Sequence, residues 1–575
     1  MVILGITDGD DGGACIVRDG KLVAAVNEER MVRMKAVIGF PTRAIQEVIR
    51  LSEITPGEIT GVAVAAIKER FNPKPLENNG WFRRDKGLGK QIKNTLAGAM
   101  SPFIGKYALP KKIYHRMQVR LNPKRQEGIP ILLRELGINA PIRFYNHHLC
   151  HALSAYATSG FETAVSVTLD GGGDGCCSHV YHHKGTSLSK LHALDSFHSV
   201  GNFYSYVTHI AGYKASIHEG KITGLAAHGK PIYKDDILKL ITFREGEIIN
   251  VGNLFHQAAI RKIREMLPAD FKMQDLAASI QWVLEDVAVR YVRHWVRQSG
   301  EKKVALAGGV FANVRLNQKI AELPEVEEIY VFPHMGDGGL SVGAAFGMLG
   351  AERQRYPYPS FLETAYLGPE FSNDEIRQEL EKTSLSYHLS ENVEQEIAQF
   401  IAKGKVVARF NGKMEFGPRA LGNRSILYHG ADPAVNDWLN KRLNRTEFMP
   451  FAPAVLPEFA HQCFKVLDAG MRAAKFMTIT FDCTDEMKQH CPAVVHVDGT
   501  ARPQLVYPES NPSFYKIIDE YRKITGIPAL VNTSFNMHEE PIVCTPDDAI
   551  RSFLEGRMDI LAIGNYIVMG LDSNN

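Results

Sequence analysis

Three short apolar runs are each followed closely by glycine and then by a helix-like stretch. They cover residues 164–169, 304–307 and 329–332. Strands that alternate with helices in this way are typical of α/β proteins, because the helices cover the faces of the sheet. Side chains at the ends of such strands project into a crevice at one edge of the sheet. The sequence therefore predicts an α/β fold in which polar strand ends are candidate site residues.

A break in this alternation predicts two domains. Residues 352–361, "ERQRYPYPSF", interrupt every apolar period with aromatics, prolines and charges. A chain of 575 residues also exceeds what one hydrophobic core supports. We expect domains at residues 1–360 and 361–575, the first with a basic insertion at about residues 81–128. The insertion is either a solvated surface or a wall of an acceptor site that recognises an anionic group.

Composition excludes several classes of protein. The chain has 66 basic and 64 acidic residues, and a net charge of +2 does not indicate nucleic acid or a membrane as partner. None of the eight cysteines forms a C-x-x-C pair, which argues against a disulfide framework and a structural zinc site. No signal-peptide pattern and no apolar run of spanning length is present. We therefore expect a cytoplasmic protein without nucleic-acid or membrane partners, and leave a homodimer open.

The segment "GITDGDDGGACIV", residues 5–17, places aspartates and glycines between two apolar stretches. Such a loop is either a flexible turn or a place where the backbone comes close to a ligand. The dipeptide Asp19-Gly20 then joins the second of these apolar stretches to a third, which is typical of a β-hairpin. We expect strands at residues 2–7, 14–17 and 21–26.

Two histidines in "NHHLCHALSAY" are spaced to share one face of a helix. His147 and His151 are four residues apart, and side chains at this spacing lie one above the other. The pair either grips one metal ion or is merely packed in the helix. His148 points to a different face and is the structural histidine in this interpretation.

Two aspartates strengthen the metal hypothesis. Asp170 in "VSVTLDGGGDG" and Asp337 in "VFPHMGDGGLSVGAA" both follow predicted strands. Two imidazoles and two carboxylates suit a six-coordinate first-row ion, such as iron or manganese, with open positions for a ligand. The alternative for each aspartate is helix capping or turn chemistry.

The segment "ALAGGVFANVRLN" places Gly308 and Gly309 between a strand and a helix, with Asn313 on the first turn. Backbone N–H groups at such a position can cradle a phosphate. Tight packing is an equal explanation for a pair of glycines.

Four loops of the second unit are rich in basic and amide side chains. They lie in "NGKMEFGPRALGNRSIL", "LNKRLNRTEFMPFAPAVL", "HVDGTARPQLV" and "LVNTSFNMHEEPIVCTPDDAI". Guanidinium groups fit phosphate and carboxylate oxygens. Each loop alone is also explained by surface charge or turn chemistry. Together, in a nearly neutral chain, they favour a polyphosphate pocket.

These segments resemble the O-carbamoyltransferases of the nodulation-factor and antibiotic type, the NodU/CmcH family. The resemblance rests on "MEFGPRALGNRSIL", "FAPAVL", "HVDGTARPQ" and "TGIPALVNTSFN" in the second unit. "HHLCHALSAY", "TLDGGGDG" and "GGVFANVRLN" carry it in the first unit. It covers nearly the whole chain, and the insertion is the part least covered.

The resemblance implies an N-terminal actin-like domain of the ASKHA type, similar to threonylcarbamoyltransferases. It implies an Fe²⁺ ion held by His147, His151, Asp170 and Asp337. The adenylate would lie against Gly12, Gly308, Gly309 and Asn313.

The resemblance implies a C-terminal domain similar to the YrdC fold. There ATP, with Mg²⁺, and carbamoyl phosphate would give carbamoyl-adenylate and pyrophosphate. The N-terminal site would then transfer the carbamoyl group to a hydroxyl of a small metabolite or sugar and release AMP. The implied phosphate and carbamoyl ligands are Arg419, Arg424, Lys441, Arg502, Asn532 and Ser534.

One position departs from the family pattern. Asp10 stands where the family has a histidine that is regarded as the base. Asp10 is either a carboxylate base, with a pKa raised by neighbouring charges, or a structural or metal-neighbouring residue. A tRNA (threonyl)carbamoylation enzyme and a non-catalytic ASKHA nucleotide sensor are the alternative functions.

Overall fold

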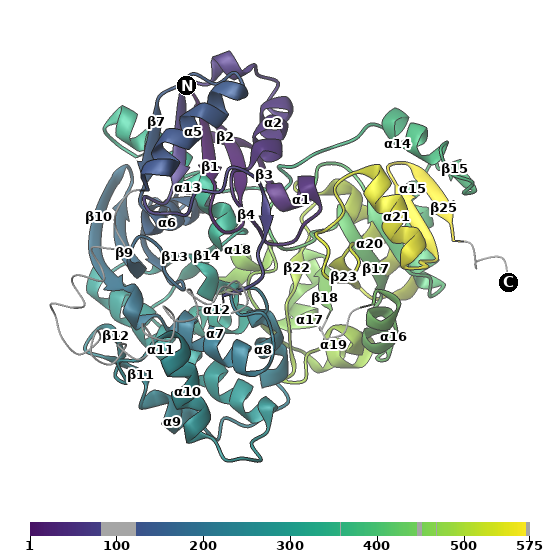
Figure 1. The fold of residues 1–575 in the computed structure, drawn as a ribbon. Helices are drawn as coiled ribbons and strands as arrows, with labels where there is room; N and C mark the ends of the chain where they lie inside the picture. Colours follow the sequence, from purple (N-terminus) through teal and green to yellow (C-terminus); the bar gives the residue numbers. More distant parts are fainter. Residues whose placement is uncertain (82–121, 357, 445–450, 467, 571–575) are drawn as a thin grey trace.

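The computed structural model describes residues 1–81, 122–356, 358–444, 451–466 and 468–570. We call residues up to 356 the N-terminal half and residues from 358 the C-terminal half (Figure 1). The strands of the two large N-terminal sheets lie within residues 2–331, and those of the eight-stranded C-terminal sheet lie within residues 387–569. The predicted α/β class is confirmed. The domain limit at residue 360 stays a prediction, and residues 82–121 of the predicted insertion lie outside the described residues.

The two five-stranded sheets of the N-terminal half repeat one strand order. Their orders are β3-β2-β1-β5-β7 and β10-β9-β8-β13-β14. In each sheet the first three strands form an antiparallel meander, and the last two run parallel to the first. This repeat supports the actin-like assignment, which stays a prediction. The strands are β1 (Val2–Thr7), β2 (Gly13–Arg18), β3 (Lys21–Asn27), β5 (Gly61–Ala65), β7 (Ile142–Tyr145), β8 (Thr163–Thr168), β9 (Cys176–Lys184), β10 (Ser187–Asp195), β13 (Lys303–Ala307) and β14 (Glu328–Val331).

The predicted hairpin is confirmed. Strands β2 and β3 pair antiparallel through a turn in which Asp19 and Gly20 have φ angles of 53° and 92°. Positive φ at both central residues is the conformation that matches the twist of a two-residue hairpin.

Helices α6 (His147–Ser159) and α13 (Leu340–Arg353) pack against each other between the two sheets. The contact is so close that a Cβ atom on Gly343 would lie 1.7 Å from the carbonyl oxygen of Cys150. Only glycine fits there. Helix α6 follows β7 directly, so its first turn lies at the carboxyl end of that strand. This layer therefore brings helix starts and strand ends into one region.

Strand residues alternate between the inner and outer faces of the first sheet. Ile3 and Ala63 pack inward with α6 and α13, whereas Leu4 and Val62 face an outer core. Helices α2 (Thr42–Leu51) and α5 (Pro123–Glu135) cover that outer core. Helices α7 (Val200–Ile210) and α11 (Met273–Ser299) contribute to the core beside the second sheet.

The C-terminal sheet has the order β15-β25-β24-β16-β17-β23-β18-β22. Helices α15 (Val393–Ala402) and α20 (Pro512–Thr525) pack on one face, and α21 (Pro546–Glu555) packs on the other. A YrdC-like fold for this half stays a prediction. The strands are β15 (Tyr387–Leu389), β16 (Val407–Phe410), β17 (Arg424–His429), β18 (Ala452–Val455), β22 (Gln504–Leu505), β23 (Ala529–Ser534), β24 (Ile560–Ile563) and β25 (Tyr566–Met569).

The two halves are joined through helix α1 (Glu28–Val32) and its C-cap residue, Arg33. Arg30 donates a hydrogen bond to the carbonyl oxygen of Gly417 at 2.9 Å. Arg33 donates to the carbonyl oxygens of Ile542 and Pro541 at 2.7 and 2.8 Å. No helix among the described residues is both long and apolar enough to cross a membrane.

Candidate functional site

The first turn of α6 carries the predicted histidine pair. The Asn146 side chain caps this helix by accepting a hydrogen bond from the backbone N–H of Leu149. The carboxylate of Asp174 accepts the N–H of His147 at 2.7 Å and also the N–H groups of Ile67 and Lys68. Asp174 therefore fixes the start of the helix and joins it to the end of strand β5.

The structure brings His147, His151, Asp170 and Asp337 together. One ligand atom from each lies within 4.8 Å of the other three. The Oδ2 atom of Asp170 lies 3.0 Å from Nε2 of His147 and 3.5 Å from Nε2 of His151. The Oδ1 atom of Asp337 lies 3.7 and 3.4 Å from the same two nitrogens. Asp170 follows β8 and Asp337 follows β14, as expected for side chains at strand ends.

This cluster fits a metal ion. Among the described residues, the buried Nε2 atom of His151 has no hydrogen bond of regular geometry, and its nearest polar atoms are the carboxylate oxygens of Asp170 and Asp337 at 3.5 and 3.4 Å. A buried nitrogen placed in this way is suited to share an ion with the two carboxylates. Two imidazole nitrogens and two carboxylate oxygens form a donor set that suits a first-row divalent ion. Burial opposes the charged form of His147, but Asp337 and Asp170 raise its pKa to about 9. The carboxylates thus create a strongly negative site that attracts a cation.

His148 has a structural role, as predicted. Its ring nitrogens contact the hydroxyl of Thr168 at 2.9 Å and the carbonyl oxygen of Cys176 at 2.8 Å. Burial and the neighbouring His147 lower its pKa well below the ordinary value. The neutral ring ties α6 to the second sheet.

The predicted phosphate cradle in the N-terminal half is largely used for packing. Gly308 has a φ of 107°, and its N–H donates to the carbonyl oxygen of Met335 at 2.7 Å. A Cβ atom there would lie 2.2 Å from the carbonyl oxygen of Leu169. Gly308 is therefore needed for close packing, the alternative that the sequence left open. A Cβ atom on Gly309 would lie 3.1 Å from Oδ1 of Asp170, so this glycine borders the metal cluster.

Asn313 and Gly12 also have local structural roles. The side chain of Asn313 caps α12 (Val314–Ala321) by accepting from Leu316 N–H, and it bonds Gln281. The N–H of Gly12 donates to Val37 O at 3.0 Å. These groups therefore have partners within the protein, and their contact with an adenylate stays a prediction.

The loop between β1 and β2, residues 8–12, holds its three carboxylates in different surroundings. Asp8 forms a buried two-point ion pair with Arg125 of α5, with N–O distances of 2.6 and 2.9 Å. Asp10 accepts a hydrogen bond from Asn78 at 3.5 Å. Burial and the charges of Asp10 and Asp8 raise the pKa of Glu69 to about 7. The predicted base therefore lies beside a second carboxyl group that the sequence did not single out.

Asp11 of the same loop is affected by the charge of Asp337, one of the four clustered residues. It has a left-handed φ of 51°. Burial raises its pKa well above the ordinary value, and the negative charges of Glu29 and Asp337 add to the shift.

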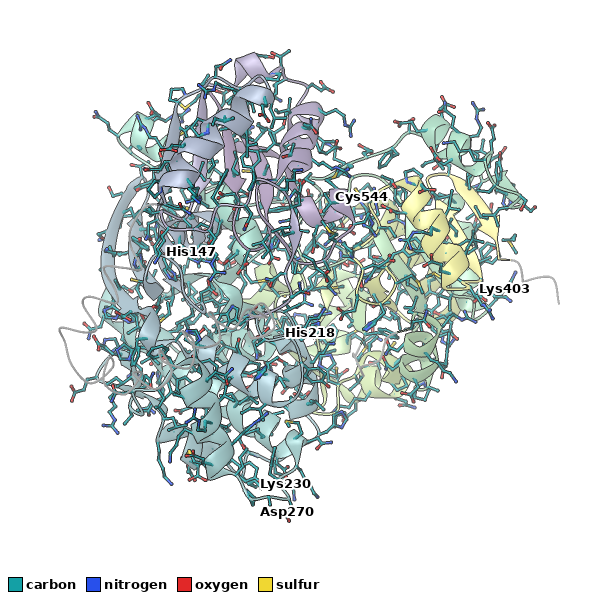
Figure 2. All side chains as sticks on the ribbon, viewed as in Figure 1. His147, His218, Lys230, Asp270, Lys403 and Cys544 are labelled. Atoms are coloured by element: carbon teal, nitrogen blue, oxygen red, sulfur yellow. The ribbon has the colours of Figure 1, made fainter. Side chains whose placement is uncertain are left out.

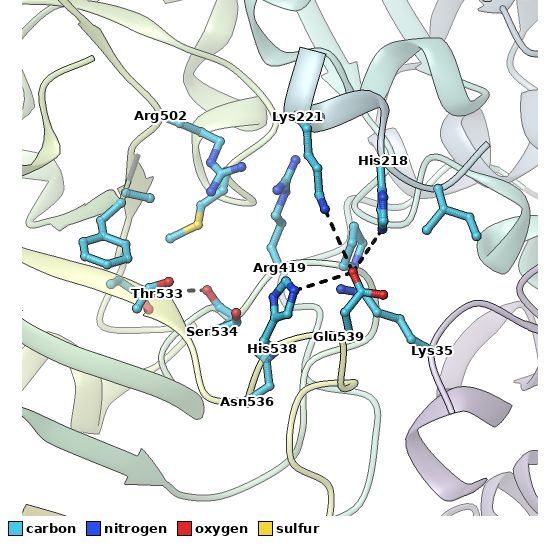
Figure 3. Close-up of a pocket in the computed structure, with 18 residues that line it drawn as sticks. Lys35, His218, Lys221, Arg419, Arg502, Thr533, Ser534, Asn536, His538 and Glu539 are labelled. Carbon is cyan, nitrogen blue, oxygen red and sulfur yellow. Dashed lines mark hydrogen bonds and ion pairs between the residues drawn. The ribbon is translucent and has the colours of Figure 1, made fainter. Parts of the chain in front are cut away.

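Four of the six predicted phosphate ligands line one cavity of about 240 Å³ whose walls come from both halves. They are Arg419, Arg502, Asn532 and Ser534 (Figure 3). Asn532 and Ser534 lie on β23, whereas both arginines lie in loops. The amide of Asn532 donates to Gln504 at 2.9 Å, and its buried Oδ1 atom has no hydrogen-bond partner among the residues that the structure describes.

The two arginines form a cationic site. Among the described residues, neither has a side-chain hydrogen bond or an ion pair, and the Nε atom of each is buried without a partner. Burial lowers the pKa of Arg419 to about 10. Burial and the charge of Arg419 lower the pKa of Arg502 well below its ordinary value. Paired guanidinium groups without a counter-ion are suited to a phosphate or carboxylate.

Arg424 and Lys441 do not line this cavity. Arg424 is fully buried, stacks on Phe410 at 3.7 Å, and donates to the carbonyl oxygens of Asn411 and Gly412. Its guanidinium organises the loop that carries Arg419, which corrects its predicted ligand role. Lys441, on α16 (Val435–Arg442), lines a separate cavity beside Trp438.

The N-terminal half supplies the opposite wall of the cavity. Lys35, His218 and Lys221 face the two arginines (Figure 3). Figure 2 shows His147 inside the N-terminal half and His218 near its border with the C-terminal half. The sequence did not indicate these wall residues, because they lie far from the C-terminal loops in the chain.

The loop of Arg419 packs directly against the loop of Asp337. A Cβ atom on Gly417 would lie 3.1 Å from the carbonyl oxygen of Pro333, and the rings of Phe416 and His334 are 4.9 Å apart. The cavity and the metal cluster are therefore separated by only a few residues along each loop.

Comparisons with known proteins cover both halves. A family model described as "Carbamoyltransferase N-terminus" matches residues 2–346, and one described as "Carbamoyltransferase C-terminus" matches residues 398–569. An uncharacterized protein from Methanocaldococcus jannaschii is 32% identical over 97% of this chain and 97% of its own length. The nodulation protein NolNO from Sinorhizobium fredii is 32% identical over 97% of this chain and 78% of its own length.

The similarity to solved structures is weak. The activator of 2-hydroxyisocaproyl-CoA dehydratase from Clostridium difficile with bound ADPNP covers 62% of this chain and 97% of its own, at 13% identity and a TM-score of 0.31. A TM-score this low supports no argument about fold or ligands.

Proposed function

The chain belongs to the NodU/CmcH-like carbamoyltransferase family, and on this premise we propose that it is an ATP-dependent O-carbamoyltransferase with two sites. The observation that carries the proposal is the pair Arg419 and Arg502 beside Asn532 and Ser534, two cations that have no anionic partner in the part of the chain that the structure describes. This cavity would bind the phosphates of ATP and carbamoyl phosphate.

The first step would form carbamoyl-adenylate in the C-terminal half. Carbamoyl phosphate, ATP and water would give carbamoyl-adenylate, phosphate and pyrophosphate. The bond to the α-phosphorus of ATP forms to a carbamoyl oxygen, and the bond to pyrophosphate breaks. Arg419 and Arg502 would stabilise the charge that moves onto pyrophosphate, together with Mg²⁺ bound to ATP. The adenosine part adds binding energy that positions the reacting carbonyl.

The second step would take place at the metal cluster. An acceptor hydroxyl attacks the carbamoyl carbon, AMP leaves, and the hydroxyl proton passes to a base. Asp10 is our candidate for that base, with Glu69 beside it. His147, His151, Asp170 and Asp337 would hold an iron ion, which when bound can polarise a carbonyl oxygen. The close contact between the Gly417 and Pro333 loops keeps the two sites near each other.

The acceptor is proposed to be a hydroxyl of a small metabolite or sugar. The net charge of +2 gives no support to a tRNA substrate, and membership in an enzyme family argues against a non-catalytic sensor. The test is incubation with ATP, carbamoyl phosphate and a library of hydroxylated acceptors, followed by mass spectrometry. Carbamoylation that requires ATP supports the proposal, whereas carbamoylation without ATP contradicts it.

A further inference from the structure

Glu539 has an unusual backbone conformation at the edge of the cavity. Its φ angle is 60°, in the left-handed region that residues other than glycine rarely adopt. It lies five residues beyond the end of β23, in the segment that Arg33 holds through Pro541 and Ile542. Strained conformations of this kind persist where the surrounding structure enforces them, and they cluster at ligand sites.

The strained backbone points the Glu539 carboxylate at a basic wall of the N-terminal half (Figure 3). Its Oε2 atom accepts a hydrogen bond from Lys214 at 3.2 Å. Its Oε1 atom lies 3.2 Å from Nε2 of His218, 4.0 Å from Nζ of Lys221 and 4.0 Å from Nε2 of His538. One carboxylate of the C-terminal half thus faces three basic side chains of the other half.

Among the contacts between Glu539 and the N-terminal half, the one with Lys221 is the longest. At 4.0 Å it is at the limit of an ion pair, whereas the Lys214 contact is a hydrogen bond. The side chain of Glu539 is 37% exposed, so the carboxylate can be reached from the cavity. Across the cavity stand Arg419 and Arg502, whose guanidinium groups have no ion-pair partner among the described residues.

The charges around the cavity are therefore unequal. Among the described residues, the two arginines of the C-terminal wall have no anionic partner, whereas His218 and Lys221 of the N-terminal wall contact the carboxylate of Glu539. A ligand phosphate bound to the arginines would face Lys221 on the opposite wall, and its oxygens would compete with Glu539 for that ammonium group. Charge-assisted contacts to phosphate are stronger than a long, partly exposed ion pair.

We propose that Lys221 is a phosphate-binding residue that completes the cavity from the N-terminal half, and that Glu539 is its exchangeable counter-ion. Without a ligand, the Glu539 carboxylate contacts His218 and Lys221 of the N-terminal wall. A bound phosphate group replaces Glu539 as the ionic partner of Lys221, while the hydrogen bond from Lys214 keeps the Glu539 carboxylate in position. Glu539 thereby sets the affinity of the cavity for phosphate compounds. This inference rests on the proposed function, since it takes the ligand to be a phosphate substrate or product.

The test measures pyrophosphate binding by calorimetry to the full chain. Glu539→Gln removes the competing charge, and we expect about fivefold tighter binding. Lys221→Met should weaken binding about tenfold. In the Lys221→Met background, Glu539→Gln should have less than twofold effect, because the two changes act on one contact. Glu540→Gln is the matched control, since Glu540 pairs with Arg551 at 2.7 Å and does not line the cavity.

A second measurement guards against misfolded variants. Amine-reactive labelling of the wild-type chain, read by mass spectrometry, should show that pyrophosphate protects Lys221 but leaves the surface residue Lys382 unchanged. The inference would be overturned, with the proposed function intact, if Glu539→Gln bound pyrophosphate no more tightly than the wild-type chain. Unchanged labelling of Lys221 at saturating pyrophosphate would have the same consequence. If the wild-type chain binds neither pyrophosphate, ATP nor carbamoyl phosphate, the proposed function fails as well.

Discussion

The guanidinium groups of Arg419 and Arg502 face one cavity, and the charge of the first lowers the pKa of the second. Among the described residues no carboxylate pairs with either of them. Holding two buried charges of the same sign close together costs free energy unless a ligand of opposite charge compensates them. The pair is therefore the anion-binding site that we propose.

Arg419→Ala should reduce the rate of pyrophosphate release at least about a hundredfold, because one of the two charges that stabilise the leaving group is lost. A coupled pyrophosphate assay measures the rate. Lys441→Ala is the control, since Lys441 lines a different cavity and should leave release unchanged. An Arg419→Ala variant with unaltered release would show that the cavity is not the adenylation site.

His147→Ala should abolish iron binding and carbamoyl transfer while pyrophosphate release continues. The reason is that Nε2 of His147 lies 3.0 Å from Oδ2 of Asp170, and its removal opens the proposed ligand set. Elemental analysis after anaerobic loading with Fe²⁺ measures the metal. His182→Ala serves as control, because His182 pairs with Glu301 at 2.7 Å outside the cluster. Iron content equal to wild type in His147→Ala would refute the metal assignment.

Asp10→Asn should slow transfer about a hundredfold or more, because an amide cannot accept the acceptor proton as a carboxylate does. Pyrophosphate release should be unaffected, since Asp10 lies in the N-terminal half. Product formation under single-turnover conditions separates the two steps. Unchanged transfer would leave Asp10 with only a structural role.

Glu69 makes the stability of the chain depend on pH. Burial, together with the charges of Asp10 and Asp8, raises its pKa from 4.5 to about 7. An acid whose pKa is raised by folding favours the folded state below about pH 4.5, and that contribution is lost as the pH rises through 7. Glu69→Gln should therefore stabilise the chain at pH 8 by up to about 2 kcal/mol and have little effect at pH 5. Denaturant unfolding at both pH values measures this, and an equal effect at both would contradict it.

That four candidate metal ligands come together was predictable from the sequence because the signals are local. His147 and His151 are one helical turn apart, and Asp170 and Asp337 lie in the loops that follow strands β8 and β14. The α/β class was predictable for the same reason. The loops of Arg502 and Asn532 favoured a phosphate pocket from their residue types, the family resemblance implied these two residues as ligands, and the fold brings them to one cavity.

Other roles depend on tertiary contacts that no local pattern encodes. Arg424 has the same type of side chain as Arg419, yet it is buried against backbone carbonyl groups. The N–H of Gly308 is used inside the fold, although its position between strand and helix is typical of phosphate sites. Lys221 and Glu539 meet only because the two halves pack together.

The most direct test of the account is to measure pyrophosphate release by the purified chain with ATP and carbamoyl phosphate, separately and together. We predict release only when both substrates are present, because the cavity must hold the nucleotide and the carbamoyl donor at once. Release with ATP alone, or no release with both, would contradict a carbamoyl-adenylate pathway.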